Sequence, residues 1–190
     1  MSVSRLISLN LTGLCFLLAG RLPAQQGDDE SQRMTLRGLH HFATHARVQL
    51  SGGVPLQPID EARLRGKLEA ALRREGIGVV GETDVRDGTQ AELGFQYLVM
   101  ATRDPLGRPS GFVASACLEA SQLVKLQRIT ASGAPVYAVV PTWHTCGLVA
   151  GDLASFTQTM LQKADQQIVR FIQAWRAGNG RESRVTNHES

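Results

Sequence analysis

Four residues in the second half of the chain are of types that could do chemistry. Cys117 and Glu119 are two residues apart, and so are His144 and Cys146. Residues two apart share one face of a β-strand, so each pair could present both side chains together. Thiolate, imidazole and carboxylate groups are zinc ligands, and a reduced cysteine is a nucleophile. In an oxidising compartment the two cysteines would instead form a disulfide.

The spacing of apolar residues predicts the elements that must position these side chains. Alternating or continuous apolar runs predict strands over residues 42–50, 77–80, 91–103, 112–129 and 135–145. Apolar residues recur every three or four positions in two helices, one between Asp60 and Gly76 and one between Asp152 and Gly178. The order β-α-β-β-β-β-α predicts an α/β fold. It would be an α+β two-layer sandwich, with two helices on one face of a mixed, mostly antiparallel sheet.

The last two predicted strands form a hairpin whose register can be counted. A symmetric turn at residues 131–132 places Cys117 opposite Cys146, and Glu119 opposite His144. At a non-hydrogen-bonded pair the Cα atoms lie about 4.5 Å apart, a separation that a disulfide spans. A structural disulfide is the leading interpretation. Two free thiols, or a metal site at Cys117, Glu119, His144 and Cys146, stay open as alternatives.

The register of the preceding hairpin follows from a turn near Gly107. It predicts three opposed pairs: Tyr97 with Leu118, Phe95 with Ala120, and Leu98 with Cys117. The two registers together place one set of apolar side chains under the helices: Leu93, Phe95, Tyr97, Val99, Ala114, Ala116, Leu118, Val124, Leu126, Tyr137, Val139 and Trp143. On the opposite face, beside the cysteines, we expect a mildly apolar partner surface formed by Leu98, Met100, Leu123 and Val140.

The N-terminus has the layout of a secretory signal peptide. Arg5 precedes an apolar run over residues 6–19, and the small residue Ala24 offers a cleavage site. The run is too short for a comfortable transmembrane span, and no second apolar run approaches that length, so no membrane span is expected after signal removal. We expect four segments along the chain: a signal peptide over 1–24, a disordered leader over 25–35, a single α/β sandwich domain over 36–179 and a disordered tail over 180–190.

The charge of the chain does not indicate nucleic-acid binding. Its 190 residues contain 20 Lys and Arg against 17 Asp and Glu. Arg5 and Arg21 would leave with the signal peptide, so 18 basic and 17 acidic residues would remain. We therefore expect no nucleic-acid partner.

No motif points to a cofactor or to a familiar catalytic centre. The sequence has no phosphate loop, nucleophile elbow or dinucleotide-binding fingerprint. The glycines over residues 76–81 follow a helix and enter a strand, whereas the dinucleotide motif needs the reverse order. We expect no cofactor, and we assign no catalytic residue.

Several patterns resemble small exported bacterial proteins of unknown function. The resemblance spans residues 36–177 and rests on four features: Ile59-Asp60, the series Leu64, Leu68 and Leu72 leading into Ile77, the Val-, Leu- and Gln-rich strand over 118–128, and Thr142-Trp143. More distantly, the layout is similar to the N-terminal domain of the TolB translocation protein. The resemblance implies the order of elements given above and a binding or assembly role, and it brings no known active site.

Two functions from different classes remain. The first is an exported protein, periplasmic or extracellular, that acts as a non-enzymatic binding or assembly module. Its partner would be another cell-envelope protein or a second copy of the chain. The alternative is a thiol- or metal-dependent activity at Cys117, Glu119, His144 and Cys146, which requires reduced cysteines or bound metal.

Overall fold

The computed structural model of the protein describes residues 29–51, 59–81, 90–129, 133 and 135–180. In chain order these ranges form α1 (Glu30–Thr35), β1 (His41–Ser51), α2 (Glu61–Arg74), β2 (Gly78–Val80), β3 (Gln90–Arg103), β4 (Pro109–Ile129), β5 (Pro135–Gly151) and α3 (Phe156–Gly178). The predicted order β-α-β-β-β-β-α is confirmed, with α1 as an additional element. The expected signal peptide, and the tail after residue 180, lie outside the described residues.

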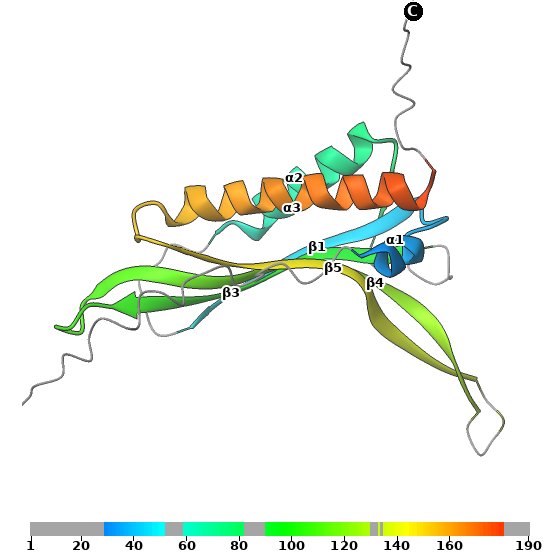
Figure 1. The fold of residues 1–190 in the computed structure, drawn as a ribbon, viewed down its shortest axis with the longest axis horizontal. Coiled ribbons are helices and arrows are strands. Elements are labelled where there is room, and N and C mark those ends of the chain that lie inside the picture. Colours follow the sequence, from blue (N-terminus) through cyan, green and yellow to red (C-terminus); the bar gives the residue numbers. More distant parts are fainter. Residues whose placement is uncertain (1–28, 52–58, 82–89, 130–132, 134, 181–190) are drawn as a thin grey trace, which may run out of the picture.

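The strands form one five-stranded sheet in the order β2-β1-β3-β4-β5. β1 pairs in parallel with both β2 and β3, whereas β4 pairs antiparallel with β3 and with β5. α2 and α3 contact each other and lie on the same face of the sheet (Figure 1). The fold is therefore the predicted two-layer α/β sandwich.

α1 differs from the disordered leader expected over residues 25–35. The Asp29 carboxylate caps the helix by accepting the N–H of Gln32 at 2.8 Å. The helix is held against the edge of the sheet, where Thr35 Oγ1 donates to the carbonyl of Thr142 at 3.0 Å. A helix this short is not stable alone. Contacts with distant residues therefore stabilise it, and local sequence patterns do not reveal them.

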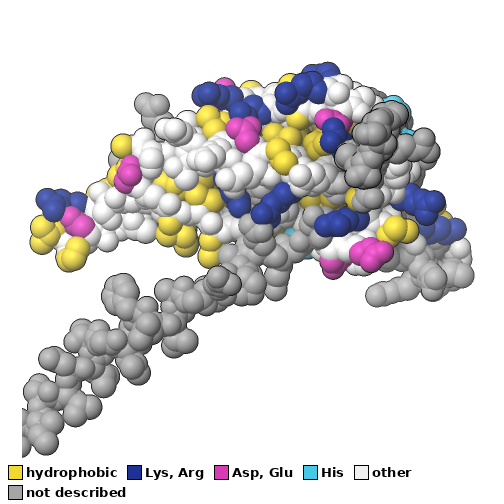
Figure 2. Space-filling view, turned by 45° about the horizontal axis from the view of Figure 1, so that its top comes forward, with side chains coloured by type: hydrophobic (Ala, Val, Ile, Leu, Met, Phe, Trp, Pro, Cys, Tyr) yellow, Lys and Arg dark blue, Asp and Glu magenta, His cyan; other side chains and the backbone are white. Residues whose placement is uncertain are grey.

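α2 begins and ends where the sequence predicts. Asp60 Oδ1 accepts the N–H of Ala62 at 2.9 Å, and Gly76 follows the helix with a φ of 71°, which glycine adopts without strain. Its buried face consists of Leu64, Leu68, Ala71 and Leu72. Its outer face carries both signs of charge, for example in the ion pair between Lys67 and Asp165. Figure 2 shows acidic side chains interspersed among the Lys and Arg side chains on the helical side.

α3 begins later than predicted. The sequence pattern allows it to start directly after Asp152, but the first helical residue is Phe156. The Asp152 carboxylate instead accepts the N–H of Ser155 at 2.7 Å and closes a turn before the helix. Leu153, the first residue of the predicted apolar stripe, lies before the helix and is half-buried, whereas the rest of the stripe is buried: Phe156, Met160, Ala164, Ile168, Phe171 and Trp175. No helix among the described residues is long and apolar enough to cross a membrane.

A buried polar network joins α3 to the central strands. Gln167 is 1% exposed, and its Oε1 accepts the Tyr97 hydroxyl at 2.9 Å. Its Nε2 donates to the carbonyl of Ala116 at 2.9 Å and to that of Thr145 at 3.0 Å. Burial, together with the negative charge of Asp165, raises the pKa of Tyr97 well above its ordinary value. The phenol therefore stays protonated and keeps donating to Gln167.

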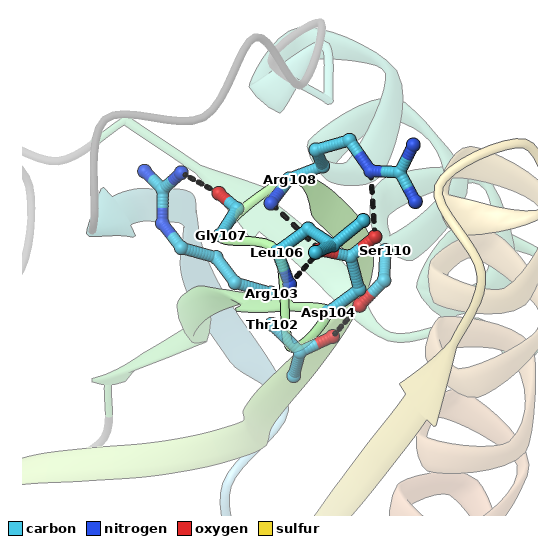
Figure 3. Close-up of polar contacts among 7 residues, drawn as sticks. All are labelled: Thr102, Arg103, Asp104, Leu106, Gly107, Arg108 and Ser110. Atoms are coloured by element: carbon cyan, nitrogen blue, oxygen red, sulfur yellow. Dashed lines mark hydrogen bonds and ion pairs between the residues drawn. The ribbon is translucent and has the colours of Figure 1, made fainter.

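Asp104 organises the turn between β3 and β4 (Figure 3). Its Oδ1 accepts the N–H groups of Leu106 and Arg108, each at 2.9 Å, and its Oδ2 accepts Arg108 Nε at 2.7 Å. Gly107 adopts a φ of 76° in the same turn. Hydrogen bonds from Arg108 hold the pKa of Asp104 below its ordinary value. The turn is thus tighter than one centred beyond Gly107.

With this tighter turn, the observed register of β3 and β4 differs from the predicted register by two residues. The observed pairs are Phe95 with Leu118, Gln96 with Cys117, and Tyr97 with Ala116. The predicted partners Ala120 for Phe95, Leu118 for Tyr97 and Cys117 for Leu98 are therefore wrong. A shift of two residues leaves each side chain on its predicted face. All four predicted β3 residues of the helix-covered face are buried: Leu93, Phe95, Tyr97 and Val99.

The register of β4 and β5 is as predicted around the cysteines and differs further along the hairpin. Cys117 pairs with Cys146, and Ala120 pairs with Trp143. Ser121 then pairs with Pro141, so that Thr142 is an extra residue at a β-bulge. Beyond this bulge the hairpin bends away from the sheet as an arm of residues 121–129 and 135–141 (Figure 1).

The bulge reverses the face of the β5 residues in the arm. Tyr137 and Val139 are predicted under the helices, but they are 55% and 60% exposed. Val139 pairs with Leu123, and Val140 pairs with Gln122. One extra residue moves every preceding side chain of a strand to the other face. The predicted placement of Tyr137 and Val139 is therefore wrong.

We expect Gln167→Leu to lower the free energy of unfolding by about 1–3 kcal/mol, because the buried Tyr97 hydroxyl loses its acceptor. Urea unfolding followed by circular dichroism measures the change. Gln166 is exposed on the same helix, so Gln166→Leu is the matched control and should change stability by less than about 0.5 kcal/mol. Equal effects of the two substitutions would contradict the network.

Asp104 should titrate below the ordinary carboxyl value of 3.8. Because the folded-state pKa is the lower one, its contribution to stability is present above the unfolded pKa and is lost as pH falls through the folded pKa. An NMR titration of the side-chain carboxyl measures the midpoint. Arg108→Ala should raise that midpoint, and a midpoint unchanged by this substitution would argue against the turn geometry.

Candidate functional site

The face of the sheet away from α2 and α3 is the candidate site, and we call it the open face. Among the described residues, no helix covers it (Figure 1). Side chains on β-strands alternate between the two faces. The open face therefore carries the neighbours of the buried core residues, in rows that the strand register defines. Four of these rows contain predicted residues: Leu98, Met100, the pair Cys117 and Cys146, and the pair Glu119 and His144.

The row at the centre of the open face contains the disulfide. Cys117 and Cys146 are opposed on β4 and β5, with Cα atoms 4.1 Å apart, and their sulfur atoms are bonded to each other. This separation is typical of a non-hydrogen-bonded pair of an antiparallel ladder. The predicted disulfide is thus confirmed, and it joins the two strands where the register was counted.

The oxidised cysteines remove the thiol and thiolate groups that the alternative function requires. Glu119 lies opposite His144 in the adjacent row, as predicted, and the Ser121 hydroxyl donates to Glu119 Oε1 at 3.1 Å. In the part of the chain that the structure describes, no group of three or more His, Cys, Asp or Glu side chains is arranged to hold a metal ion. In this structure the two sulfur atoms of the set Cys117, Glu119, His144 and Cys146 are bonded to each other.

His45, which the sequence suggests is a surface histidine, adds a side chain to this row. It lies on β1 beside Gly94, and its imidazole ring occupies the space that a Cβ at Gly94 would need. Its Nε2 lies 3.1 Å from Nε2 of Gln96. Because Gly94 pairs with Glu119, the row forms a polar band across the sheet from β1 to β5. A glycine inside a strand is the signal that could have predicted this close approach.

An apolar patch lies on the open face toward the β3–β4 turn. Leu98 is 46% exposed, Met100 is 51% exposed and Leu148 is 67% exposed. Leu98 on β3 and Leu148 on β5 both pair with Ser115, which lies between them on β4. Met100 pairs with Val113 in the next row. Leu98 and Met100 belong to the predicted partner surface, whereas Leu148 does not. Leu148 was missed because the predicted strand ended at Thr145, whereas β5 and its alternation of faces continue through Cys146, Leu148 and Ala150.

The other two predicted residues of the partner surface are not part of this patch. Leu123 is half-buried and belongs to the arm, on the far side of the disulfide from Leu98. Val140 lies opposite Gln122, whose Nε2 donates to the Thr35 carbonyl of α1 at 2.9 Å. Val140 is therefore on the side of α1. The bulge at Thr142 separates it from the open face.

The chain has only weak similarity to known proteins. No protein-family model and no curated protein matches it. A solved PelC dodecamer from Paraburkholderia phytofirmans is 15% identical, with a TM-score of 0.38, and the match covers 80% of this chain and 95% of that chain. Rare lipoprotein B from Shewanella oneidensis is 11% identical, with a TM-score of 0.31, and the match covers 72% and 92%. Both are bacterial proteins, and neither provides a link to TolB.

We expect the disulfide to stabilise the protein by about 3–4 kcal/mol, because the closed loop restricts the unfolded chain. The cysteines are 29 residues apart in the sequence. Urea unfolding of the oxidised protein and of the double variant Cys117→Ala/Cys146→Ala measures the difference. Reductant should shift the unfolding midpoint of the native protein and leave that of the double variant unchanged. A native midpoint that does not respond to reductant would refute the expectation.

Proposed function

We propose that the protein is exported and acts as a non-enzymatic binding or assembly module of the cell envelope, with the open face as its partner surface. The observation that carries this proposal is the apolar patch of Leu98, Met100 and Leu148. These three large side chains are about half exposed or more, on a sheet whose other face packs against α2 and α3. Clustered exposed apolar side chains mark interaction surfaces.

The arrangement of the patch suits a protein partner. Leu98 and Leu148 stand on either side of the small residue Ser115, so that a partner side chain can enter between them. Along the strands, the row of Gln96 and the disulfide comes next to the patch, and the polar band with His45 and Glu119 follows it. An apolar centre with a polar rim is the usual composition of a protein–protein interface. The partner would be another cell-envelope protein or a second copy of the chain.

Two features support export. The layout of residues 1–24 predicts a secretory signal peptide. The bonded pair of Cys117 and Cys146 belongs to the chemistry of an oxidising compartment, since cytosolic thiols are kept reduced. We therefore place the protein in the periplasm or outside the cell.

A photo-cross-linking amino acid at Leu148 should capture the partner in the native envelope, because this side chain points out of the patch. The matched control position is Val169 on α3, which is apolar and 54% exposed on the helical side. Adding Leu98→Asp should reduce the cross-linked product at Leu148 about tenfold, since a charge in an apolar contact is not compensated. Cross-linked products are measured by mass spectrometry.

The result at the two positions decides the proposal. An equal yield at Val169 and Leu148, or a Leu148 product that Leu98→Asp does not reduce, would show that the open face is not the partner surface. Because Leu98 is exposed, Leu98→Asp should leave the thermal unfolding midpoint close to that of the native protein. A lowered midpoint would mean that Leu98 has a packing role, which the proposal excludes.

A further inference from the structure

β5 is an edge strand whose outer backbone groups are only partly used. α1 covers one stretch, where the N–H of His144 donates to Gln32 Oε1 at 3.4 Å and the carbonyl of Thr142 accepts Thr35 Oγ1 at 3.0 Å. Outward and inward backbone groups alternate along an antiparallel strand. The outward set that continues from His144 is therefore formed by Cys146, Leu148 and Ala150.

The outward N–H and C=O groups of these three residues have no hydrogen-bond partner among the described residues. Proline and charged side chains are the usual means of blocking an exposed edge. The stretch from Cys146 to Ala150 contains neither, whereas Pro135 and Pro141 interrupt the arm. A regular, unblocked edge of this kind is a template for an added strand.

α3 overhangs this edge and forms a groove with it. The groove is a cavity of about 330 Å³ between Leu148, Val149 and Ala150 of β5 and the Thr159–Gln166 part of α3. A strand added along β5 would place every second side chain in this groove, because side chains alternate between faces. The groove thus supplies the side-chain pocket that accompanies backbone pairing in strand addition.

Lys163 gives the groove its charge. It lines the cavity and is half-buried. No described residue forms an ion pair with it. Burial lowers its pKa, and the nearby charge of Arg170 adds repulsion. A negative group in the groove would relieve both effects, so the complementary ligand is acidic.

We propose that the β5 edge from Cys146 to Ala150 accepts an extended segment of a partner protein as an added strand, with an acidic side chain of that segment next to Lys163. This goes beyond the proposed function, because it uses the backbone edge and the groove rather than the open face. A second copy paired through its own β5 would bring a second Lys163 to the same interface. Charge therefore favours a different, acidic partner.

Synthetic peptides of about nine alternating Thr and Val residues test the proposal, with Asp or Lys at the centre. They are added to the ¹⁵N-labelled disulfide-bonded protein. The Asp peptide should slow amide hydrogen exchange at Leu148 and Ala150, whose N–H groups point outward, and leave Val149 unchanged, because its N–H already faces β4. The Asp peptide should bind about fivefold to tenfold more tightly than the Lys peptide, with a preference that falls as salt is raised.

Matched variants separate the edge from the groove and from the open face. Ala150→Pro removes one outward N–H and should weaken binding about tenfold, whereas Ala150→Ser keeps the N–H and should bind normally. Lys163→Met should remove the preference for Asp over Lys, and Lys163→Arg should keep it. Leu98→Asp alters only the open face and should leave peptide binding unchanged.

Three results would overturn the proposal. The first is the absence of slowed exchange at Leu148 and Ala150 with millimolar Asp peptide. The second is a Lys163→Met variant that binds the Asp peptide as tightly as the native protein does and still prefers it to the Lys peptide. The third is protection of these amides that rises with protein concentration and needs no peptide, because the occupant would then be a second copy. If Ala150→Pro does not fold, the exchange pattern of the native protein and the Lys163→Met result decide the matter.

Discussion

The rest of the structure depends on the pairing of β4 with β5 at Cys117 and Cys146. Bonds on both faces of the sheet stabilise this pairing. On the open face the two sulfur atoms are bonded. On the helical face Gln167 Nε2 donates to the carbonyls of Ala116 and Thr145, which flank the cysteine pair. Slippage of the hairpin would have to break the disulfide and leave buried polar groups without hydrogen bonds. Each unpaired buried group costs about 1–3 kcal/mol. The register is therefore set at this point.

The fixed register divides the hairpin into two parts with different roles. Toward Gly151 the strands lie under α3, and Leu148 meets Leu98 across Ser115 on the open face. Toward residue 129 the bulge at Thr142 turns the hairpin out of the sheet as the arm (Figure 1). The extra residue also exchanges the faces of β5, so apolar residues of the arm such as Tyr137 and Val139 are exposed. The disulfide and the bulge together decide which side chains reach the open face.

Patterns of period two and period 3.6 predicted the elements, the layers and most of the buried residues, because they depend only on side-chain direction. The opposition of Cys117 and Cys146 was also predictable, because the register shift falls beyond Ala120 and leaves their count intact. The β3–β4 register was off by two residues because the Asp104 carboxylate tightens the turn, yet the faces were right. The face on which a side chain lies is thus predicted from sequence more reliably than the residue that it pairs with on the neighbouring strand.

The remaining errors concern features that depend on distant contacts. Pro141 next to the bulge at Thr142 is a residue that marks bulges in strands, but it does not say which residue is the extra one, and Val140 was assigned to the wrong face as a result. Gln167 looks like the exposed glutamines around it until its contacts with Tyr97 and the strand carbonyls are known. α1 is short and polar, and it exists because it covers the β5 edge near His144. No local pattern contains this information.

The two edges of the sheet show how much exposed backbone the fold tolerates. β2 at one edge has only three residues, and a short strand is a poor template for pairing. β5 at the other edge has 17 residues, and Pro135, Pro141 and the contacts of α1 with Thr142 and His144 protect part of its length. The protection stops at Cys146, where the groove beneath α3 begins. Among the described residues, the stretch from Cys146 to Ala150 is therefore the part of this edge that combines free outward backbone groups with a groove containing a lysine, and both are features that a strand-shaped acidic ligand would use.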